Sequence, residues 1–171
     1  MRMAKNLILL GMMGAGKSTV SKILAKQLNF RVFDTDKLVE KKNLMTISEI
    51  FQKKGEEFFR NQEEMICINY LNGNNKIIAL GGGAFISKKI RDAVLLNGVS
   101  FFLDVSLKIL YSRLKKNKKR PLLNTKDLRN TLENIIKQRR PIYKLANHTI
   151  NCNNLKTKEV ASEIIKKYAK H

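Results

Sequence analysis

Several kinds of residue and segment are scarce or missing in this chain. There are two cysteines, Cys67 and Cys152, and neither belongs to a CxxC motif or lies beside a pair of histidines. We interpret both as reduced, structural thiols. No apolar run approaches the roughly 18 residues that a membrane-spanning helix needs, and the opening stretch MRMAKNLILLG is too short before its glycine to be a secretory signal. These absences predict a cytoplasmic protein that does not associate with a membrane.

Acidic residues are scarce as well, since 14 Asp and Glu stand against 34 Lys and Arg and leave a formal net charge of +20. Such a charge attracts anions in general, including nucleotides, small acids and nucleic acids. The lysines are spread over nearly every segment, which is typical of solvated helix faces, whereas a DNA-reading surface concentrates them on one element. We therefore expect no specific nucleic-acid partner, and keep a nucleic-acid-binding ATPase or a non-catalytic binding module as the alternative from another class.

The chain also lacks internal repeats and linkers rich in proline, glycine or serine, and its 171 residues suit a single domain. Short apolar runs alternate with amphipathic segments of helical spacing. These runs, which are the expected strands, are residues 6–10, 30–34, 76–80, 99–105 and 148–152. The alternation predicts an α/β fold in which helices cover both faces of a parallel sheet.

Helix boundaries carry signals of their own. The expected N-caps are Thr46, Ser87, Ser106 and Thr157. Glu49 completes a possible capping box with Thr46, and Gly98 is expected to end the helix that Ser87 opens. The lysine-rich stretch 115–120 is a candidate loop.

A glycine-rich stretch, GMMGAGKST at residues 11–19, follows the first apolar run and precedes a helical segment. It fits the pattern G-x-x-x-x-G-K-S, in which glycines let backbone N–H groups turn inward and form an anion site at a helix N-terminus. Lys17 is placed to reach the β- and γ-phosphates, and Ser18 to ligate Mg²⁺. The flanking strand and helix favour this interpretation over a glycine-rich turn with an incidental lysine. We therefore predict a site for a nucleoside triphosphate.

Two aspartates, Asp34 and Asp36, end the second expected strand in the stretch FDTD. Alternation along a strand would point both side chains to the same side, at the sheet edge where ligands bind. One carboxylate is a candidate Mg²⁺ ligand through water, and the other a candidate partner for an acceptor hydroxyl. Taken singly, either aspartate is more simply explained as the cap of the next helix.

Four further features have both a functional and a plain interpretation. Arg60 lies on an expected helix in the stretch GEEFFRNQEE and can form two hydrogen bonds to one carboxylate. Considered without the other motifs, it is better explained as a surface residue. Glycines 81–83 follow a strand and either admit a small polar ligand or form a flexible turn. Arg120 either folds over the phosphates or belongs to a solvated charge run. Arg139 and Arg140 lie at an expected helix end, where their plain role is to stabilise the helix C-terminus.

The order and spacing of these motifs resemble the shikimate kinases over nearly the full length of the chain. The matching segments are G-x-x-G-x-G-K-S at 11–18, D-T-D at 34–36, G-E-x-x-F-R-x-x-E at 55–63, G-G-G at 81–83, R-P-L-L at 120–123 and R-x-P-x-Y at 139–143. The resemblance implies a three-layer α/β/α phosphate-loop fold of the nucleoside monophosphate kinase-like type, with a five-stranded parallel sheet. It also implies a shikimate-binding helical region at 37–63 and a mobile lid at 112–124. The match is weakest around 152–155, where an adenine-contacting loop has no sharp motif.

The same resemblance assigns roles to individual residues. The implied ATP-binding residues are Gly14, Ala15, Gly16, Lys17, Ser18, Thr19, Arg113 and Arg120, with Arg113 stacked on adenine and Arg120 closing from the lid. The implied shikimate-binding residues are Asp36, Phe51, Phe59, Arg60, Gly81, Gly82, Gly83 and Arg139, with Glu63 holding Arg60 in position. Mg²⁺ would be held by Ser18 and, through water, by Asp34. The implied catalytic residues are Lys17, Asp36 and Arg120.

The activity that the resemblance implies is transfer of the γ-phosphoryl group of MgATP to the 3-hydroxyl of shikimate, in the synthesis of chorismate for aromatic amino acids. Whether Asp36 removes the proton or only orients the hydroxyl stays open, and so does the choice between Arg139 and Arg140, although the spacing to Pro141 favours Arg139. Another small-molecule or nucleoside monophosphate kinase of the same architecture is the nearest alternative. The expected partners are shikimate and ATP, and the expected state is a monomer.

Overall fold

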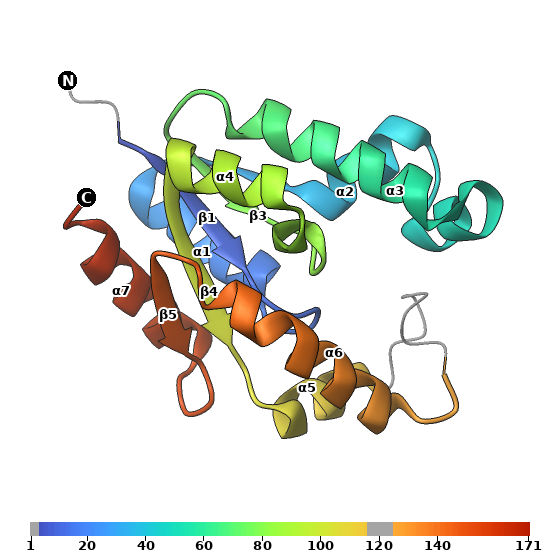
Figure 1. The fold of residues 1–171 in the computed structure, drawn as a ribbon. Coiled ribbons are helices and arrows are strands. Elements are labelled where there is room, and N and C mark those ends of the chain that lie inside the picture. The colour runs from blue at the N-terminus through green and yellow to red at the C-terminus, as the bar shows by residue number, and fades with distance from the viewer. Residues whose placement is uncertain (1–3, 116–124) are drawn as a thin grey trace.

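A computed structural model describes residues 4–115 and 125–171, and its centre is a parallel β-sheet (Figure 1). The five strands follow the order β2-β3-β1-β4-β5, and every pairing between neighbours is parallel. Their bounds are β1 Asn6–Leu10, β2 Arg31–Asp34, β3 Lys76–Ala79, β4 Gly98–Asp104 and β5 His148–Asn151. All five expected strands are therefore present, each within one residue of its expected ends.

Helices cover both faces of this sheet, as the alternation in the sequence predicts. They are α1 Lys17–Leu28, α2 Thr35–Asn43, α3 Ile47–Leu71, α4 Lys88–Asn97, α5 Leu107–Leu114, α6 Leu128–Tyr143 and α7 Thr157–Tyr168, with a short 3₁₀ turn at Ala84–Ile86. In Figure 1, α4 lies in front of the strands and α1 behind them, with α7 packed against α1. The expected three-layer α/β/α class is confirmed. No helix in the described part of the chain is long and apolar enough to cross a membrane.

Strand β1 lies at the centre of the core because its sequence, NLILL, offers no polar face beyond Asn6. All five of its residues are buried, as expected for a parallel strand with helices on both sides. A second, separate cluster lies between α2 and α3. It consists of Val39, Ile47, Ile50, Phe59 and Ile66. The segment α2–α3 thus has a small core of its own, beside the main one.

The caps expected from the sequence are mostly present. Thr46 forms the capping box with Glu49, Ser87 caps α4, and α4 ends at Gly98. The prediction that Thr157 is the N-cap of α7 was wrong by one residue, because the N-cap is Lys156. The backbone N–H of Lys156 donates to Glu159 Oε2 at 2.5 Å. The carboxylate three residues along therefore satisfies this helix start without a hydroxyl cap.

Ser106 occupies the N-cap position of α5, but no side-chain cap bond forms there, and its backbone N–H donates to Asn153 Oδ1 at 2.7 Å. The candidate loop 115–120 lies outside the described residues from 116 onward.

The helix expected over the stretch GEEFFRNQEE is interrupted at its first residue. Gly55 has φ 85° and ψ 168°, far from helical values, so α3 bends there and restarts at Glu56. A positive φ is strained for any residue with a side chain, and glycine relieves that strain. The glycine itself was the available signal in the sequence. The prediction of a continuous helix did not take its helix-breaking effect into account.

Candidate functional site

The loop between β1 and α1 forms a backbone cradle at a helix N-terminus. Gly14 and Gly16 have φ values of 79° and 95°, which only glycine adopts at little cost, and Gly16 is the N-cap of α1. With the chain turned this way, several N–H groups and the positive end of α1 converge on one point. The predicted phosphate loop thus has the conformation that anion binding requires.

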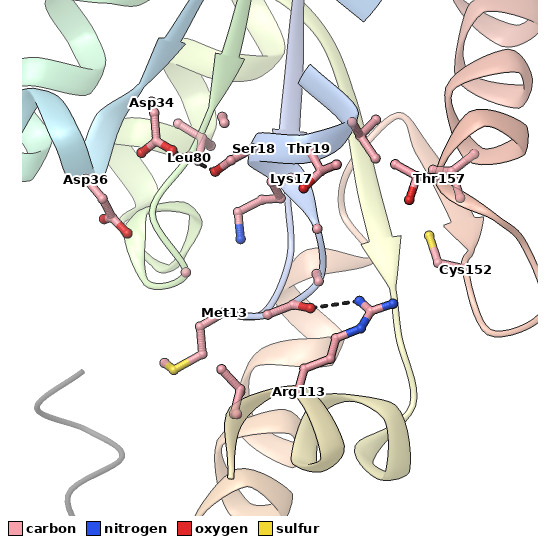
Figure 2. A pocket seen from close by; sticks show the side chains of 18 of the residues that line it. Met13, Lys17, Ser18, Thr19, Asp34, Asp36, Leu80, Arg113, Cys152 and Thr157 are labelled. Carbon is pink, nitrogen blue, oxygen red and sulfur yellow. Dashed lines mark hydrogen bonds between the residues drawn. The ribbon is translucent and has the colours of Figure 1, made fainter. Parts of the chain in front are cut away.

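Lys17 and Ser18 project from the start of α1 into this cradle (Figure 2). Lys17 Nζ donates to the carbonyls of Gly11 and Met12 at 2.8 and 3.0 Å, which holds the ammonium over the loop. Ser18 Oγ donates to Asp34 Oδ2 at 2.8 Å. A hydroxyl and a carboxylate side by side, next to a phosphate cradle, are the hard oxygen ligands that Mg²⁺ prefers.

Asp34 is also the N-cap of α2, the structural role considered for it in the sequence. Its Oδ1 accepts a hydrogen bond from the backbone N–H of Lys37 at 3.3 Å. Asp36 is not on the strand, so the argument from alternation was wrong for this pair. The strand ends at Asp34, and Asp36 lies in the first turn of α2. Both carboxylates still reach the same cleft, because the helix starts at the sheet edge.

That cleft has a volume of about 430 Å³ and runs from Asp36 across the phosphate loop to the far edge of the sheet. At the other end Arg113 reaches in from α5, and its Nη1 donates to the carbonyl of Gly14 at 2.8 Å (Figure 2). Cys152, Leu155 and Thr157 line the same end. Cys152 is largely buried, and burial raises the pKa of its thiol to about 11. The thiol is therefore protonated and unreactive at neutral pH, as expected of a structural thiol.

A second, smaller cavity adjoins the cleft on the side of α3. Its lining residues are Met13, Asp36, Ile47, Phe51, Phe59, Arg60, Glu63, Gly82, Gly83 and Arg139. Three of them, Met13, Asp36 and Gly82, also line the larger cleft, so the two spaces lie side by side. Phe51 and Phe59 form an apolar wall, with their ring centroids 4.9 Å apart.

Arg60 is fixed in this cavity by two carboxylates and an aromatic ring. Its Nη1 donates to Glu63 Oε2 at 2.7 Å, its Nε and Nη2 contact Glu56 Oε1 at 3.3 and 3.1 Å, and its guanidinium lies 5.1 Å from the centroid of Phe59. Burial alone would lower the pKa of Arg60, but Glu63 and Glu56 together outweigh it and raise the pKa. The predicted contact between Glu63 and Arg60 is confirmed. A side chain on Gly83 would overlap Arg60 Nη1, so glycine is required there for the arginine to lie against the turn.

Glu63 is buried, and its acidity reflects that position. Desolvation raises the pKa of its carboxyl, against the opposing effect of Arg60. Asp36 lies nearby and raises it further. The cavity is therefore lined by two acidic side chains and two arginines.

Arg139 and Arg140 point in different directions from the end of α6. Arg139 Nη1 donates to the carbonyl of Gly82 at 3.0 Å, and Tyr143 Oη donates to the same carbonyl. Arg140 instead pairs with Asp104 Oδ2 at 2.7 Å, outside the cavity. The structure thus brings Arg139 to the glycine turn and leaves Arg140 outside.

Sequence reasoning missed one residue that joins the parts of the site. Thr35, fully buried between the two aspartates, accepts a hydrogen bond from the backbone N–H of Gly81 through Oγ1 at 2.8 Å. Its place in the middle of the DTD motif was the available signal. Arg120 and most of the expected lid, residues 116–124, lie outside the described residues.

A family model, several relatives and a solved structure match most of this chain. A sequence model of the family described as shikimate kinase matches residues 13–169. A shikimate kinase from Bartonella henselae is 41% identical over 160 residues, which cover 94% of this chain and 76% of the relative. Another, from Caldanaerobacter subterraneus subsp. tengcongensis, is 39% identical over 166 residues, which cover 97% of each. The structure of shikimate kinase from Acinetobacter baumannii in complex with shikimate matches with a TM-score of 0.94 at 31% identity, covering 98% of this chain and 94% of that one.

Proposed function

The chain belongs to the shikimate kinase family, and we propose that it transfers the γ-phosphoryl group of ATP to the 3-hydroxyl of shikimate, giving shikimate 3-phosphate and ADP. The observation that supports this reaction most strongly is that two different sites adjoin. The cleft over the phosphate cradle lies beside a small cavity that has an aromatic wall and two arginines, and Asp36 lines both.

ATP would place its phosphates on the loop at 11–19 and its base at the end where Arg113 reaches in. Ser18 and Asp34 would hold Mg²⁺, which supplies positive charge to the phosphate oxygens when bound. Lys17, held over the loop, is placed to offset negative charge on the transferred group. Arg120 stays a prediction for the same task.

Shikimate is a carboxylate with three hydroxyls on a small ring, and the second cavity offers a partner for each part. Arg60 and Arg139 flank the glycine turn and suit the carboxylate. The rings of Phe51 and Phe59 suit the apolar side of the ring. Asp36 lies where the cavity meets the phosphate cleft, so it suits the hydroxyl that reacts.

In the proposed reaction the 3-hydroxyl oxygen forms a bond to the γ-phosphorus, while the bond from that phosphorus to the bridging oxygen of ADP breaks. The hydroxyl proton leaves as the new bond forms, and Asp36 either takes it or holds the hydroxyl in line for its loss. Catalysis then rests on positioning and on charge stabilisation, which suits a site whose side chains are already held by hydrogen bonds.

A coupled assay of ADP release tests this proposal. The purified chain is given MgATP with shikimate, with quinate or with a panel of nucleoside monophosphates, at physiological ionic strength. Release that depends on shikimate supports the proposal. Release that follows a nucleoside monophosphate would replace it with the nearest alternative, and release that follows added nucleic acid would favour a nucleic-acid-binding ATPase. Sedimentation in the same buffer tests the further proposal that the chain acts as a monomer.

A further inference from the structure

Glu56 forms an ion pair with Arg60 beside the second cavity. Glu56 occupies the edge of the Arg60 guanidinium formed by Nε and Nη2, with both nitrogens directed at Glu56 Oε1. That edge is one of those through which arginine can make two parallel hydrogen bonds to a carboxylate. The carboxylate of Glu56 therefore occupies a part of Arg60 that could also bind the carboxylate of a ligand.

The break at Gly55 explains how Glu56 comes to lie there. Because α3 restarts at Glu56, this carboxylate lies in a first helical turn, where the free N–H groups stabilise negative charge. Glu56 is also four residues before Arg60, which places both side chains on one face of the restarted helix. The Glu56 side chain is 58% exposed and is absent from the cavity lining, so it covers Arg60 from the rim.

The balance of charge in the cavity makes this contact costly for an anionic ligand. Arg60 and Arg139 are already matched inside the cavity by Asp36 and Glu63. Glu56 adds a third acidic group at the rim, in direct contact with one of the two arginines. A carboxylate that enters must therefore compete for Arg60 against a neighbouring charge of its own sign.

We propose that Glu56 is a built-in competitor for the substrate carboxylate, which tunes substrate affinity by occupying Arg60 until shikimate displaces it. This inference rests on the proposed function, because it takes shikimate as the carboxylate that binds. The plain alternative is that Glu56 and Arg60 form an ordinary helix-surface pair that helps to orient the arginine. The two explanations predict opposite changes in substrate affinity. Removing a competitor strengthens substrate binding, whereas removing a support weakens it.

The test is steady-state kinetics on Glu56→Gln, which keeps the shape of the side chain and removes its charge. An ion pair between partly exposed side chains is worth about two- to fivefold in an equilibrium constant. We therefore expect KM for shikimate to fall by about two- to fivefold, with kcat and KM for ATP changed by less than about twofold. The decrease should shrink in about 0.5 M salt, because an exposed pair is screened.

Glu57→Gln is the matched control. Glu57 is the next residue, is exposed, and forms no ion pair with Arg60 in the described part of the chain. It removes the same charge from the same helix turn, so a general effect of net charge would appear in both variants. We expect KM to change only in Glu56→Gln.

Each result has a definite meaning. A rise in KM for Glu56→Gln, or equal changes in both variants, would overturn the inference and leave the proposed function intact. If the unmodified chain shows no release of ADP that depends on shikimate, the proposed function fails first, and the inference fails with it.

Discussion

Replacing Arg60 with alanine should affect stability and substrate binding through two separable causes. Arg60 Nη1 lies 2.7 Å from Glu63 Oε2, and the side chain of Glu63 is only 3% exposed. Removing one partner of a fully buried pair costs about 3–5 kcal/mol, because it leaves a buried charge unpaired. Since Arg60 is itself about one-third exposed, we expect a smaller loss of unfolding free energy, about 2 kcal/mol.

The loss of substrate binding has a different origin. A hydrogen bond to a charged group contributes about 1.5–3 kcal/mol, so losing the guanidinium should raise KM for shikimate by about 10- to 150-fold, with ATP binding nearly unchanged. The double variant Arg60→Ala, Glu63→Gln separates the two causes. It removes the unpaired charge, so urea unfolding should show most of the stability restored while KM stays high.

The pH dependence gives a further check on the same variant. Burial raises the pKa of Glu63, and Arg60 opposes this rise, so Arg60→Ala should raise the pKa further. A carboxyl whose folded-state pKa lies above its unfolded value binds protons better when folded, so stability falls as pH rises through that interval. The cost of Arg60→Ala should therefore be smaller at pH 5 than at pH 8. Equal costs at both values, or an unchanged KM, would refute the reasoning.

The remaining predictions concern the phosphate loop and the junction of the two cavities. Lys17→Ala should lower kcat by about 100-fold or more with any acceptor, because it removes a positive charge aimed at the transferred group, and single-turnover measurements at saturating ATP would show it. Asp36→Asn should lower kcat far more than it changes the urea midpoint, and near-normal kcat would remove Asp36 from the mechanism. Thr35→Val should lower the free energy of unfolding by about 1–3 kcal/mol, because it leaves the buried N–H of Gly81 without a partner; a neutral result in urea would contradict that.

Local patterns in the sequence were enough to predict much of this fold. The run NLILL followed by GMMGAGKST is a buried strand that ends in a glycine-rich loop, and each residue type there has a steric or electrostatic reason to be present. The capping box of Thr46 and Glu49 is equally local, as is the contact between Arg60 and Glu63, three residues apart on one helix. Interactions that span a few residues are fixed by backbone geometry, so their spacing reveals them.

Features that depend on distant segments could not be predicted in this way. The spacing to Pro141 favoured Arg139 over Arg140, but the pairing of Arg140 with Asp104 from β4, which draws it away from the cavity, has no local signal. The role of Thr35 depends on Gly81, 46 residues away along the chain, because β2 and β3 end side by side. Asp36 reached the cleft from a helix start, although the pattern suggested a strand, since both positions lie at the same sheet edge.

Phosphorus NMR of a complete reaction tests the central claim most directly. The chain is incubated with MgATP and a limiting amount of shikimate, and the spectrum is recorded when ATP consumption stops. The account predicts a phosphate monoester on the 3-hydroxyl of shikimate, in an amount equal to the ADP formed. Inorganic phosphate as the sole new product beside ADP would contradict it, because the phosphate loop would then serve hydrolysis and the arginine-lined cavity would not bind the acceptor.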